Sequence, residues 1–368
     1  MVFSLLNTVR IRTLFHSMVA WLCCMWFPAC APSVVPVDNA SAKQVYQNPV
    51  FVPVLADPTV ILDSASGFFY AYGTEDNWGD GKGSRLVPVL RSGDLIEWTY
   101  VGEAFPSKPS WKKAGGLWAP EVDMIDGKYY MYYSFSTWGD ANPGIGLAIA
   151  DKPEGPFRDQ GAILTSKGID VPNSIDPSFF QENGKKYLLW GSFDDGPRQG
   201  IHLVELDAKG LKVQDRQKKV KLAAGDWEAP MIHLHEGYYY FFGSKGSCCE
   251  GARSTYHVRV ARSKHLLGPY LDRDGHPITE RGRGTMLLHG SHQVAGPGHH
   301  AKLIRDDAGD DWLLYHGIYK DEDKVSSGAS RRTLMLDKLT WNDGWPEIEG
   351  ATPSTTKKQA PILKHKKS

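Results

Sequence analysis

Short hydrophobic runs with alternating polar positions recur along the chain, and each is followed by a turn and a run rich in aromatic residues. In the first, residues 59–63 precede a turn that ends at Gly67, and the aromatic run 68–72 follows. Two such runs separated by Gly, Asp or Asn predict a β-hairpin. Five segments share this pattern, at residues 57–73, 119–134, 176–191, 229–243 and 298–317. The chain is therefore expected to repeat one hairpin-based unit five times.

Each repeat is long enough to hold a complete propeller blade. The spacing between repeats somewhat exceeds the roughly 40 to 50 residues of common four-stranded blades, and strand-like runs follow the hairpins. We therefore predict an all-β fold, a five-bladed β-propeller over residues 49–349, in which radial repetition protects the sheet edges. A β-sandwich with insertions is the alternative. The positions taken as equivalent in the five repeats are Pro58, Pro120, Pro177, Pro230 and His299.

The N-terminus has the features of an export signal. Arg10 and Arg12 precede an apolar run over 14–27, which is shorter than the roughly 20 residues that span a bilayer. A small residue directly before Cys30 resembles a bacterial lipoprotein signal, with ordinary signal-peptidase cleavage as the alternative. We expect residues 1–30 to be the signal and 31–48 a linker. The mature protein would then be periplasmic, extracellular or lipid-anchored to the bacterial membrane through Cys30.

Composition and charge narrow the picture further. Lys and Arg number 42 and Asp and Glu also 42, so bulk charge does not recruit nucleic acid, and the 41% hydrophobic content can build a substantial core. Outside the leader only the neighbours Cys248 and Cys249 remain, so there is no disulfide framework, and whether these two are bonded stays open. Residues 350–368 are lysine-rich without a periodic apolar pattern, which predicts a basic, disordered tail.

Three acidic residues occupy similar places in three repeats. Asp57 and Asp176 directly precede a proline, and Glu228 lies just before Ala229-Pro230. Because the innermost strands of a propeller run along the central axis, we expect these three side chains to surround one axial cavity. A surface position is the ordinary alternative for any single acid. Their surroundings are poor in charge, where a carboxylate is costly unless it has a task, so the trio suggests acid/base chemistry.

The repeats carry motifs that resemble the five blade signatures of family 43 glycoside hydrolases. These are Ala56-Asp57-Pro58, Trp118-Ala-Pro-Glu121, Asn173-Ser-Ile-Asp-Pro177, Trp227-Glu-Ala-Pro230 and Gly296-Pro-Gly-His299. Further motifs resemble the endo-arabinanases of that family, namely Gly243-Ser-Lys-Gly-Ser-Cys-Cys249, Ser254-Thr-Tyr256, Gly268-Pro-Tyr-Leu-Asp272 and Trp341-Asn-Asp-Gly-Trp-Pro346. The resemblance runs in order through the predicted propeller.

This resemblance implies an inverting hydrolase of α-1,5-linked L-arabinan. Asp57 would be the general base that activates water, and Glu228 the general acid that protonates the departing sugar oxygen. Asp176 would orient Glu228 and keep it protonated. An inverting glycosidase sets its acid and base roughly 6.5 to 9.5 Å apart so that water fits beneath the sugar ring. The expected partner is arabinan or arabino-oligosaccharide rather than nucleic acid, and we expect a monomer.

The resemblance also suggests contacts to sugar and metal. A furanose needs a flat apolar platform and directed hydrogen bonds, and the candidates are Trp118, Asn173, Ser192 and Phe193. Trp118 could equally belong to the core between blades. His299 would face a hydrated metal ion, calcium, although calcium prefers oxygen ligands and waters would supply most of its shell. The alternative is a histidine that plugs the axial channel.

Departures from the family pattern leave the mode of action open. Ala56 stands where endo-arabinanases usually have His, and Asp194 to Arg198 replaces a stretch that lines substrate subsites. His300 stands where family members commonly have Asn. Endo and exo action therefore both stay open, and the alternatives are an exo-acting α-L-arabinofuranosidase, a β-xylosidase, or a non-catalytic glycan-binding propeller.

One further pair has the spacing of metal ligands. His233 and His235 are two positions apart on one predicted strand, so their side chains lie on the same face of it, as those of zinc ligands might. The sequence indicates no third ligand. A zinc site is therefore not predicted here.

Overall fold

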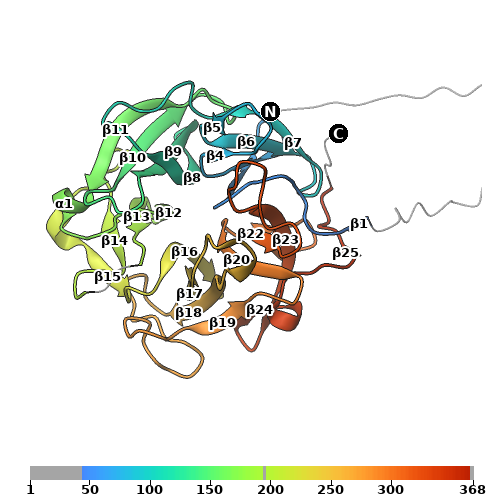
Figure 1. The fold of residues 1–368 in the computed structure, drawn as a ribbon. Coiled ribbons are helices and arrows are strands. Elements are labelled where there is room, and N and C mark those ends of the chain that lie inside the picture. The colour runs from blue at the N-terminus through green and yellow to red at the C-terminus, as the bar shows by residue number, and fades with distance from the viewer. Residues whose placement is uncertain (1–43, 194–195, 365–368) are drawn as a thin grey trace, which may run out of the picture. The chain divides into compact units, whose positions relative to one another are not determined.

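The structure is a computed structural model that describes residues 44–193 and 196–364 (Figure 1). Within this part, five antiparallel sheets are arranged in a ring about a common axis. The prediction of a five-bladed β-propeller is confirmed. The predicted signal, residues 1–30, lies outside the described residues. Among those described, we find no helix with the length and apolar character that crossing a bilayer requires.

The blades follow one another in chain order. Blade I contains β2 (Thr59–Asp63), β3 (Phe68–Tyr72), β6 (Pro88–Ser92) and β7 (Trp98–Glu103). Blade II contains β8 (Gly116–Ile125), β9 (Lys128–Ser136), β10 (Gly144–Ala150) and β11 (Arg158–Thr165). Blade III contains β12 (Ser178–Glu182), β13 (Lys185–Trp190), β14 (Ile201–Glu205) and β15 (Val220–Ala223).

The last two blades complete the ring. Blade IV contains β16 (Glu228–His235), β17 (Tyr238–Lys245), β18 (His257–Ser263) and β19 (Thr285–Leu288). Blade V contains β20 (Val294–His300), β22 (Asp311–Tyr319), β23 (Thr333–Asn342) and β24 (Trp345–Ile348), and β21 (Ile304–Arg305) pairs with β22. Smaller elements are the β4 (Asp76–Asn77) and β5 (Ser84–Arg85) hairpin, α1 (Ser166–Ile169), and 3₁₀ turns at Arg216–Lys218, Gly251–Arg253 and Glu349–Ala351.

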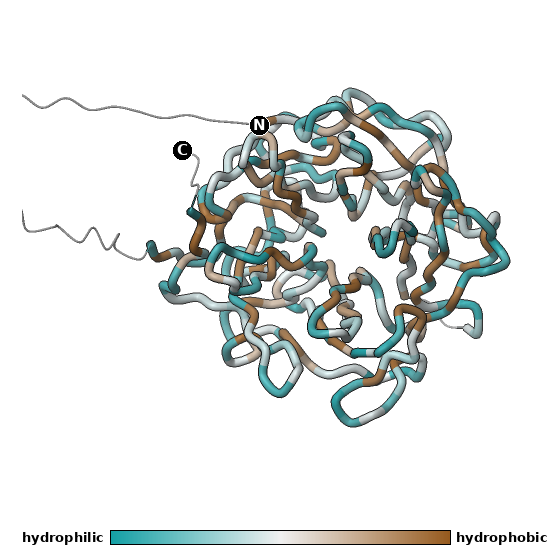
Figure 2. The backbone as a smooth tube through the Cα atoms, turned by 180° about the vertical axis from the view of Figure 1, so that it is seen from behind, coloured by the Kyte–Doolittle hydropathy of each residue, from teal (hydrophilic) through white to brown (hydrophobic). Residues whose placement is uncertain are grey.

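The hydrophobic core is divided among the spaces between neighbouring blades. There are five buried clusters, and each contains residues of two neighbouring blades. Together they fill the spaces between blades I and II, II and III, III and IV, IV and V, and V and I. Figure 2 shows many hydrophilic segments in the loops at the edge of the molecule. The aromatic runs of the sequence supply much of this packing, because large flat side chains fill the wedge between two sheets.

The two ends of the described chain close the ring together. β1 (Val45–Tyr46) pairs antiparallel with β25 (Lys358–Gln359), and the N–H of Ile362 donates to Asp306 Oδ2 at 2.9 Å. The prediction of a disordered tail over 350–368 is therefore wrong as far as Lys364, and the end of the predicted linker also belongs to the fold. The periodicity argument missed these segments because main-chain hydrogen bonds, rather than a hydrophobic pattern, hold them.

A repeated backbone device turns each inner strand toward the axis. The residue before each inner-strand proline adopts a positive φ between +43° and +57°, and so does His299 in blade V; the five are Asp57, Ala119, Asp176, Ala229 and His299. His299 is thus equivalent to the residue before the proline, and the sequence alignment that matched it to the prolines was wrong by one position. For residues with a Cβ this conformation is costly, so it needs support from its surroundings.

That support comes from the preceding blade. The N–H of Ala119 donates to Thr74 Oγ1 at 2.8 Å, and the N–H of Asp176 to Ser134 Oγ at 2.9 Å. The backbone N–H of His299 donates to Ser244 Oγ at 2.9 Å, and the backbone N–H of Asp57 donates to His316 Nδ1 at 3.1 Å. Each bond fixes the positive-φ residue of one blade against the neighbouring blade, and functional side chains from different blades are thereby brought to one end of the axis. Ala229 instead donates to Asp176 Oδ2 at 3.3 Å.

Candidate active site

The three predicted acids lie together at the axial end of their inner strands. Asp57 and Asp176 lie two residues before β2 and β12, and Glu228 is the first residue of β16. All three are buried, and the charges of Asp57 and Glu228 both act on Asp176. The propeller therefore gathers carboxyl groups from blades I, III and IV into one site, as the repeats predicted.

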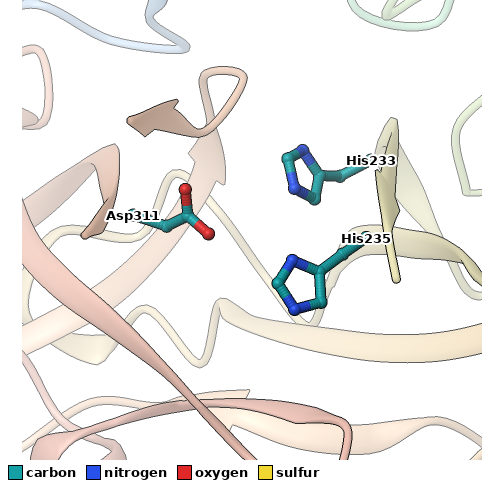
Figure 3. Close-up of side chains that lie close together, drawn as sticks. All are labelled: His233, His235 and Asp311. Atoms are coloured by element: carbon teal, nitrogen blue, oxygen red, sulfur yellow. The ribbon is translucent and has the colours of Figure 1, made fainter. Parts of the chain in front are cut away.

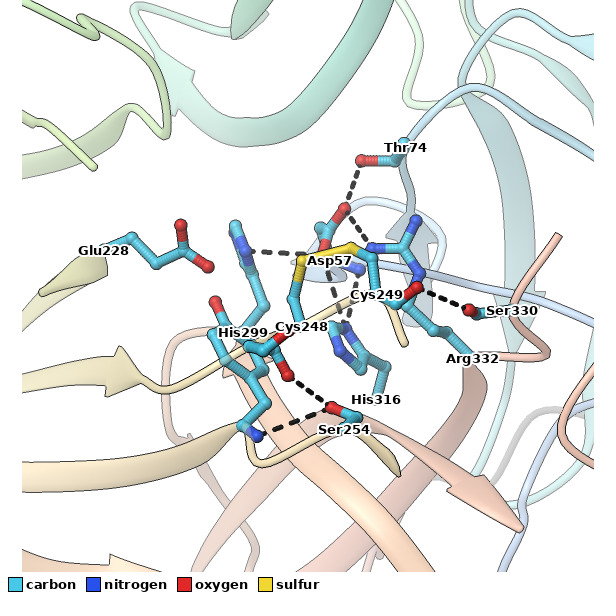
Figure 4. Close-up of a disulfide and its surroundings, with 12 residues drawn as sticks. Asp57, Thr74, Glu228, Cys248, Cys249, Ser254, His299, His316, Ser330 and Arg332 are labelled. Atoms are coloured by element: carbon cyan, nitrogen blue, oxygen red, sulfur yellow. Dashed lines mark hydrogen bonds and ion pairs between the residues drawn. A yellow bond between two sulfur atoms is a disulfide. The ribbon is translucent and has the colours of Figure 1, made fainter. Parts of the chain in front are cut away.

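Asp57 is surrounded by cationic and polar groups (Figure 4). One nitrogen of Arg332 lies 3.0 Å from both of its carboxylate oxygens, and Thr74 Oγ1 donates to Oδ2 at 2.6 Å. The Nδ1 atoms of His299 and His316 each lie 3.4 Å from Oδ1. Burial by itself would raise the pKa of Asp57, but Arg332 and the two histidines outweigh it and hold this pKa well below its usual value. Asp57 is therefore an ionised carboxylate.

Glu228 has the opposite environment. Burial raises its pKa to about 7, and the negative charge of Asp57 adds to the rise. Interactions with Tyr256 and Ser192 oppose the rise, and the Ser192 hydroxyl donates to Glu228 Oε2 at 2.7 Å. Glu228 is thus a carboxyl group that carries a proton up to neutral pH. One buried carboxyl held ionised beside another held protonated is the arrangement that acid/base catalysis requires.

Asp176 connects these two groups. Burial, and then the charges of Glu228 and Asp57, raise its pKa well above the usual value. Its Oδ2 accepts the N–H of Ala229, the residue that follows Glu228, at 3.3 Å. Asp176 is therefore placed both to hold the backbone beside Glu228 and to disfavour a second negative charge there.

The candidate sugar contacts lie in two places. Trp118 is half-buried and packs against Trp138, with ring centroids 5.8 Å apart, and Trp138 is 80% exposed. This exposed partner does not suit Trp118 as a core residue between blades. Asn173 Nδ2 donates to the carbonyl oxygen of Phe193 at 3.0 Å, which ties two candidates together near the acid. Ser192 is buried, and its hydroxyl contacts Glu228, so its first role is toward the acid.

The sequence did not point to several residues of the site. A repeated pattern could have identified Thr74, because hydroxyl residues end the aromatic run at equivalent places in four repeats, namely Thr74, Ser134, Ser192 and Ser244. No sequence pattern could have identified Arg332, since it lies in the irregular connection between β22 and β23. Trp138 similarly lies in a loop between strands of blade II.

Comparisons with known proteins agree with this site. Residues 46–346 match the family model of glycosyl hydrolases family 43. The chain belongs to family 43. It is 31% identical to the extracellular endo-alpha-(1->5)-L-arabinanase 1 of Bacillus subtilis (strain 168) over 91% of this chain and 97% of that protein.

One further relative is named as an exo-acting enzyme, and a solved arabinanase structure is also similar. The chain is 31% identical to the extracellular exo-alpha-(1->5)-L-arabinofuranosidase ArbA of Cellvibrio japonicus (strain Ueda107), over 72% of this chain and 80% of that protein. The fold of this chain is similar to that of the alpha-L-arabinanase of Cellvibrio cellulosa in complex with arabinohexaose. That likeness has a TM-score of 0.67 at 27% identity, and covers 80% of this chain and 95% of the other.

In this family 43 protein the adjacent cysteines are bonded to each other. The Cys248–Cys249 disulfide lies in the connection after β17, close to the residues around Asp57 (Figure 4). The carbonyl oxygen of Cys249 accepts from Ser330 Oγ at 3.1 Å, and Ser330 precedes Arg332 by two residues. The disulfide loop thus supports the segment that carries the arginine of the site.

The residues near His299 offer few oxygen ligands to a calcium ion. The cavity that His299 shares with His300, Lys302 and Glu121 has a volume of about 20 Å³, which is room for about one water molecule. Lys302 Nζ lies 2.8 Å from Glu121 Oε1, so an ammonium group already neutralises this carboxylate. Because calcium requires six to eight oxygen ligands, this set of two imidazoles, an ammonium and one paired carboxylate does not fit it. The calcium ion stays a prediction, and no catalytic step is assigned to it.

Proposed function

We propose that this family 43 protein is an inverting glycoside hydrolase that cleaves α-1,5-linked L-arabinan. The observation that carries the proposal is the contrast between Asp57, which Arg332 keeps ionised, and Glu228, which burial keeps protonated. A glycan-binding propeller without activity has no need for this contrast. The substrate class is supported by two relatives, which are named as an endo-alpha-(1->5)-L-arabinanase and an exo-alpha-(1->5)-L-arabinofuranosidase.

The reaction follows from the protonation states. Water attacks the anomeric carbon from the side of Asp57, and Asp57 takes up the proton that this water loses. The bond from the anomeric carbon to the glycosidic oxygen breaks as Glu228 donates its proton to that oxygen. Asp57 ends protonated and Glu228 ends ionised, and exchange with solvent restores both. Each transfer is expected to contribute about 10²–10⁴-fold to the rate.

Asp176 acts here as a positioning residue. It holds the N–H of Ala229, and the charge of Glu228 raises the pKa of Asp176 beyond the effect of burial, so the two carboxyl groups resist being ionised together. In Asp176→Asn the amide oxygen can still accept from Ala229, but the repulsion is gone. Glu228 then ionises at lower pH, and the alkaline limb of the pH profile moves down. An unchanged profile with an unchanged rate would show that Asp176 is structural only.

The proposed binding surface begins at the pair Trp118 and Trp138. Their rings lie at 45° to each other, and the exposed indole of Trp138 offers an apolar face to a sugar ring. Asn173 and Phe193 lie at the neighbouring blade III, and Phe193 follows Ser192, whose hydroxyl contacts the acid. A chain of sugars that contacts both pairs would lie beside Glu228.

We favour cleavage within the chain over removal of end units. The motif around Cys248 and Cys249 favours the endo branch, whereas the loop from Asp194 to Arg198 departs from the family pattern. Asp194 and Asp195 lie outside the described residues. A rapid early loss of viscosity of linear arabinan, with a ladder of oligosaccharides, is expected. A slow loss relative to reducing-sugar release would instead favour exo action, as in an α-L-arabinofuranosidase.

Export from the cytoplasm forms part of the proposal. The N-terminal residues have the features of a signal, and two relatives are named as extracellular enzymes. We also propose that Cys30 carries a lipid anchor. Labelling of the wild-type protein, but not of Cys30→Ser, by a radioactive fatty acid tests the anchor, and equal labelling of both would refute it. The monomeric state stays a prediction.

A further inference from the structure

Two histidines and an aspartate from different blades lie together at the far end of β16, away from the acids. His233 and His235 are separated by Leu234, which is 47% exposed, so both imidazoles lie on the face of the strand opposite to this leucine. Asp311 begins β22 of blade V. Figure 3 shows both rings directed toward the Asp311 carboxylate. One ligand atom from each residue lies within 4.8 Å of the others.

We propose that His233, His235 and Asp311 form a binding site for a divalent transition-metal ion, with zinc as the best match. Imidazole and carboxylate groups suit zinc, and three such protein ligands leave a fourth tetrahedral position for water. The sequence offered two of these ligands on one strand. The third becomes visible only when blades IV and V are assembled.

The geometry of the ligands is already fixed by a shared neighbour. Trp341 lies parallel to the His235 ring, with an interplanar angle of 3° and a centroid distance of 3.7 Å. The indole nitrogen of the same Trp341 donates to Asp311 Oδ2 at 2.7 Å. One tryptophan thus orients two of the three ligands, as the outer hydrogen-bond partners of metal ligands do.

His233 has an unused ligand atom. Its Nε2 is buried and has no hydrogen-bond partner among the described residues. A buried polar atom without a partner is costly, and a bound metal ion would satisfy it.

Arg305 now occupies the Asp311 carboxylate that the metal ion would bind. Its Nε and one terminal nitrogen each donate to Asp311 at 2.9 Å, so the guanidinium now neutralises the carboxylate. The Arg305 side chain is 56% exposed, whereas that of Asp311 is 2% exposed. Arg305 can therefore move into solvent when the metal ion takes over its charge and release Oδ1, while Trp341 keeps its bond to Oδ2.

The test uses the full chain after treatment with a chelator and desalting. Cobalt(II) is added as a spectroscopic probe, and zinc is then titrated in competition. Wild-type protein is expected to show the visible bands of four-coordinate cobalt with nitrogen and oxygen ligands. His233→Gln and Asp311→Asn are expected to lose these bands, while His265→Gln, an exposed histidine on another loop, keeps them.

Two further measurements separate a site from a structural role. Arg305→Gln is expected to bind the metal several-fold more tightly, because the competing cation is removed. Zinc is expected to raise the thermal unfolding midpoint of the wild type but not of His233→Gln, since the ion links blades IV and V. Arabinan hydrolysis by the variants checks that they are folded, because the site lies roughly 17 Å along β16 from Glu228.

Three results would overturn the proposal. The first is unchanged cobalt binding in His233→Gln and Asp311→Asn. The second is a cobalt spectrum dominated by thiolate charge transfer, which would assign the metal to cysteines instead. The third is an affinity in Arg305→Gln that equals or falls below the wild-type value, which would show that the ion does not replace the arginine at Asp311.

Discussion

One guanidinium nitrogen of Arg332 lies 3.0 Å from each carboxylate oxygen of Asp57, across 275 residues of sequence. The two side chains are almost fully withdrawn from solvent, at 12% and 11% exposure. A buried carboxylate without such a partner would take up a proton. Arg332 therefore determines whether the base is ready to accept a proton from water.

Replacement of this arginine is expected to change both rate and pH dependence. In Arg332→Gln the pKa of Asp57 rises, so Asp57 becomes protonated at higher pH and the acidic limb of the kcat/KM profile moves up. Loss of a hydrogen bond to a charged group, at about 1.5–3 kcal/mol, predicts roughly a 10- to 100-fold lower kcat/KM. The control is Arg331→Gln, which removes a neighbour that pairs with Glu322. Equal profiles for the two variants would contradict the role of Arg332.

The loss of rate that follows removal of the acid should depend on the leaving group of the substrate. Glu228→Gln keeps the shape of the side chain but cannot donate the proton, so hydrolysis of arabinan should fall by about 10²–10⁴-fold. An aryl arabinofuranoside with a good leaving group departs without protonation and should recover much of the loss. The measurement is kcat on both substrates. An equal loss on both would assign Glu228 a role other than general acid.

The hydroxyl of Ser192 provides a test in the opposite direction. It donates to Glu228 Oε2 and thereby favours the ionised form of the acid. In Ser192→Ala the pKa of Glu228 rises above about 7, so the acid stays protonated longer and the alkaline limb moves to higher pH. Ser244→Ala removes a hydroxyl that binds the His299 backbone instead, and should leave this limb in place. A limb that moves down in Ser192→Ala contradicts the assignment.

Buried histidines should make the fold sensitive to acid. Burial lowers the pKa of His300 from its usual 6.5 to about 3, so below pH 6.5 the unfolded chain binds a proton that the folded chain does not. Stability therefore falls as the pH falls through this range. In His300→Asn the slope of unfolding free energy against pH should be smaller by up to about 1.4 kcal/mol per pH unit. Urea unfolding at several pH values measures it, with His265→Gln as the control. An unchanged slope would contradict burial as the cause.

Much of the fold was readable from the sequence because the same physical constraint recurs five times. Each repeat combines a hairpin pattern with a proline beside the axis, and this placed Asp57, Asp176 and Glu228 in one site. The repeat gave no such information on blade V, where His299 was aligned one position away from its true equivalents.

Features that depend on single tertiary contacts stayed hidden. Arg332 comes from an irregular connection whose sequence has no pattern, and only the closed ring brings it to Asp57. The pairing of β1 with β25 rests on a few main-chain hydrogen bonds between distant segments. Nothing in the sequence distinguishes Asp311 from other acidic residues of strands. Only the folded structure brings it from blade V close to His233 and His235 of blade IV.

The central claim is that Asp57 activates water on one side of the sugar while Glu228 protonates the oxygen on the other. Proton NMR of the first product released from an α-1,5-linked arabino-oligosaccharide tests it most directly. We predict that a β-configured reducing end appears first and then equilibrates, and that Asp57→Asn releases almost none. An α-configured product at the earliest time points, or binding of the oligosaccharide without any release of sugar by the wild type, would contradict the account.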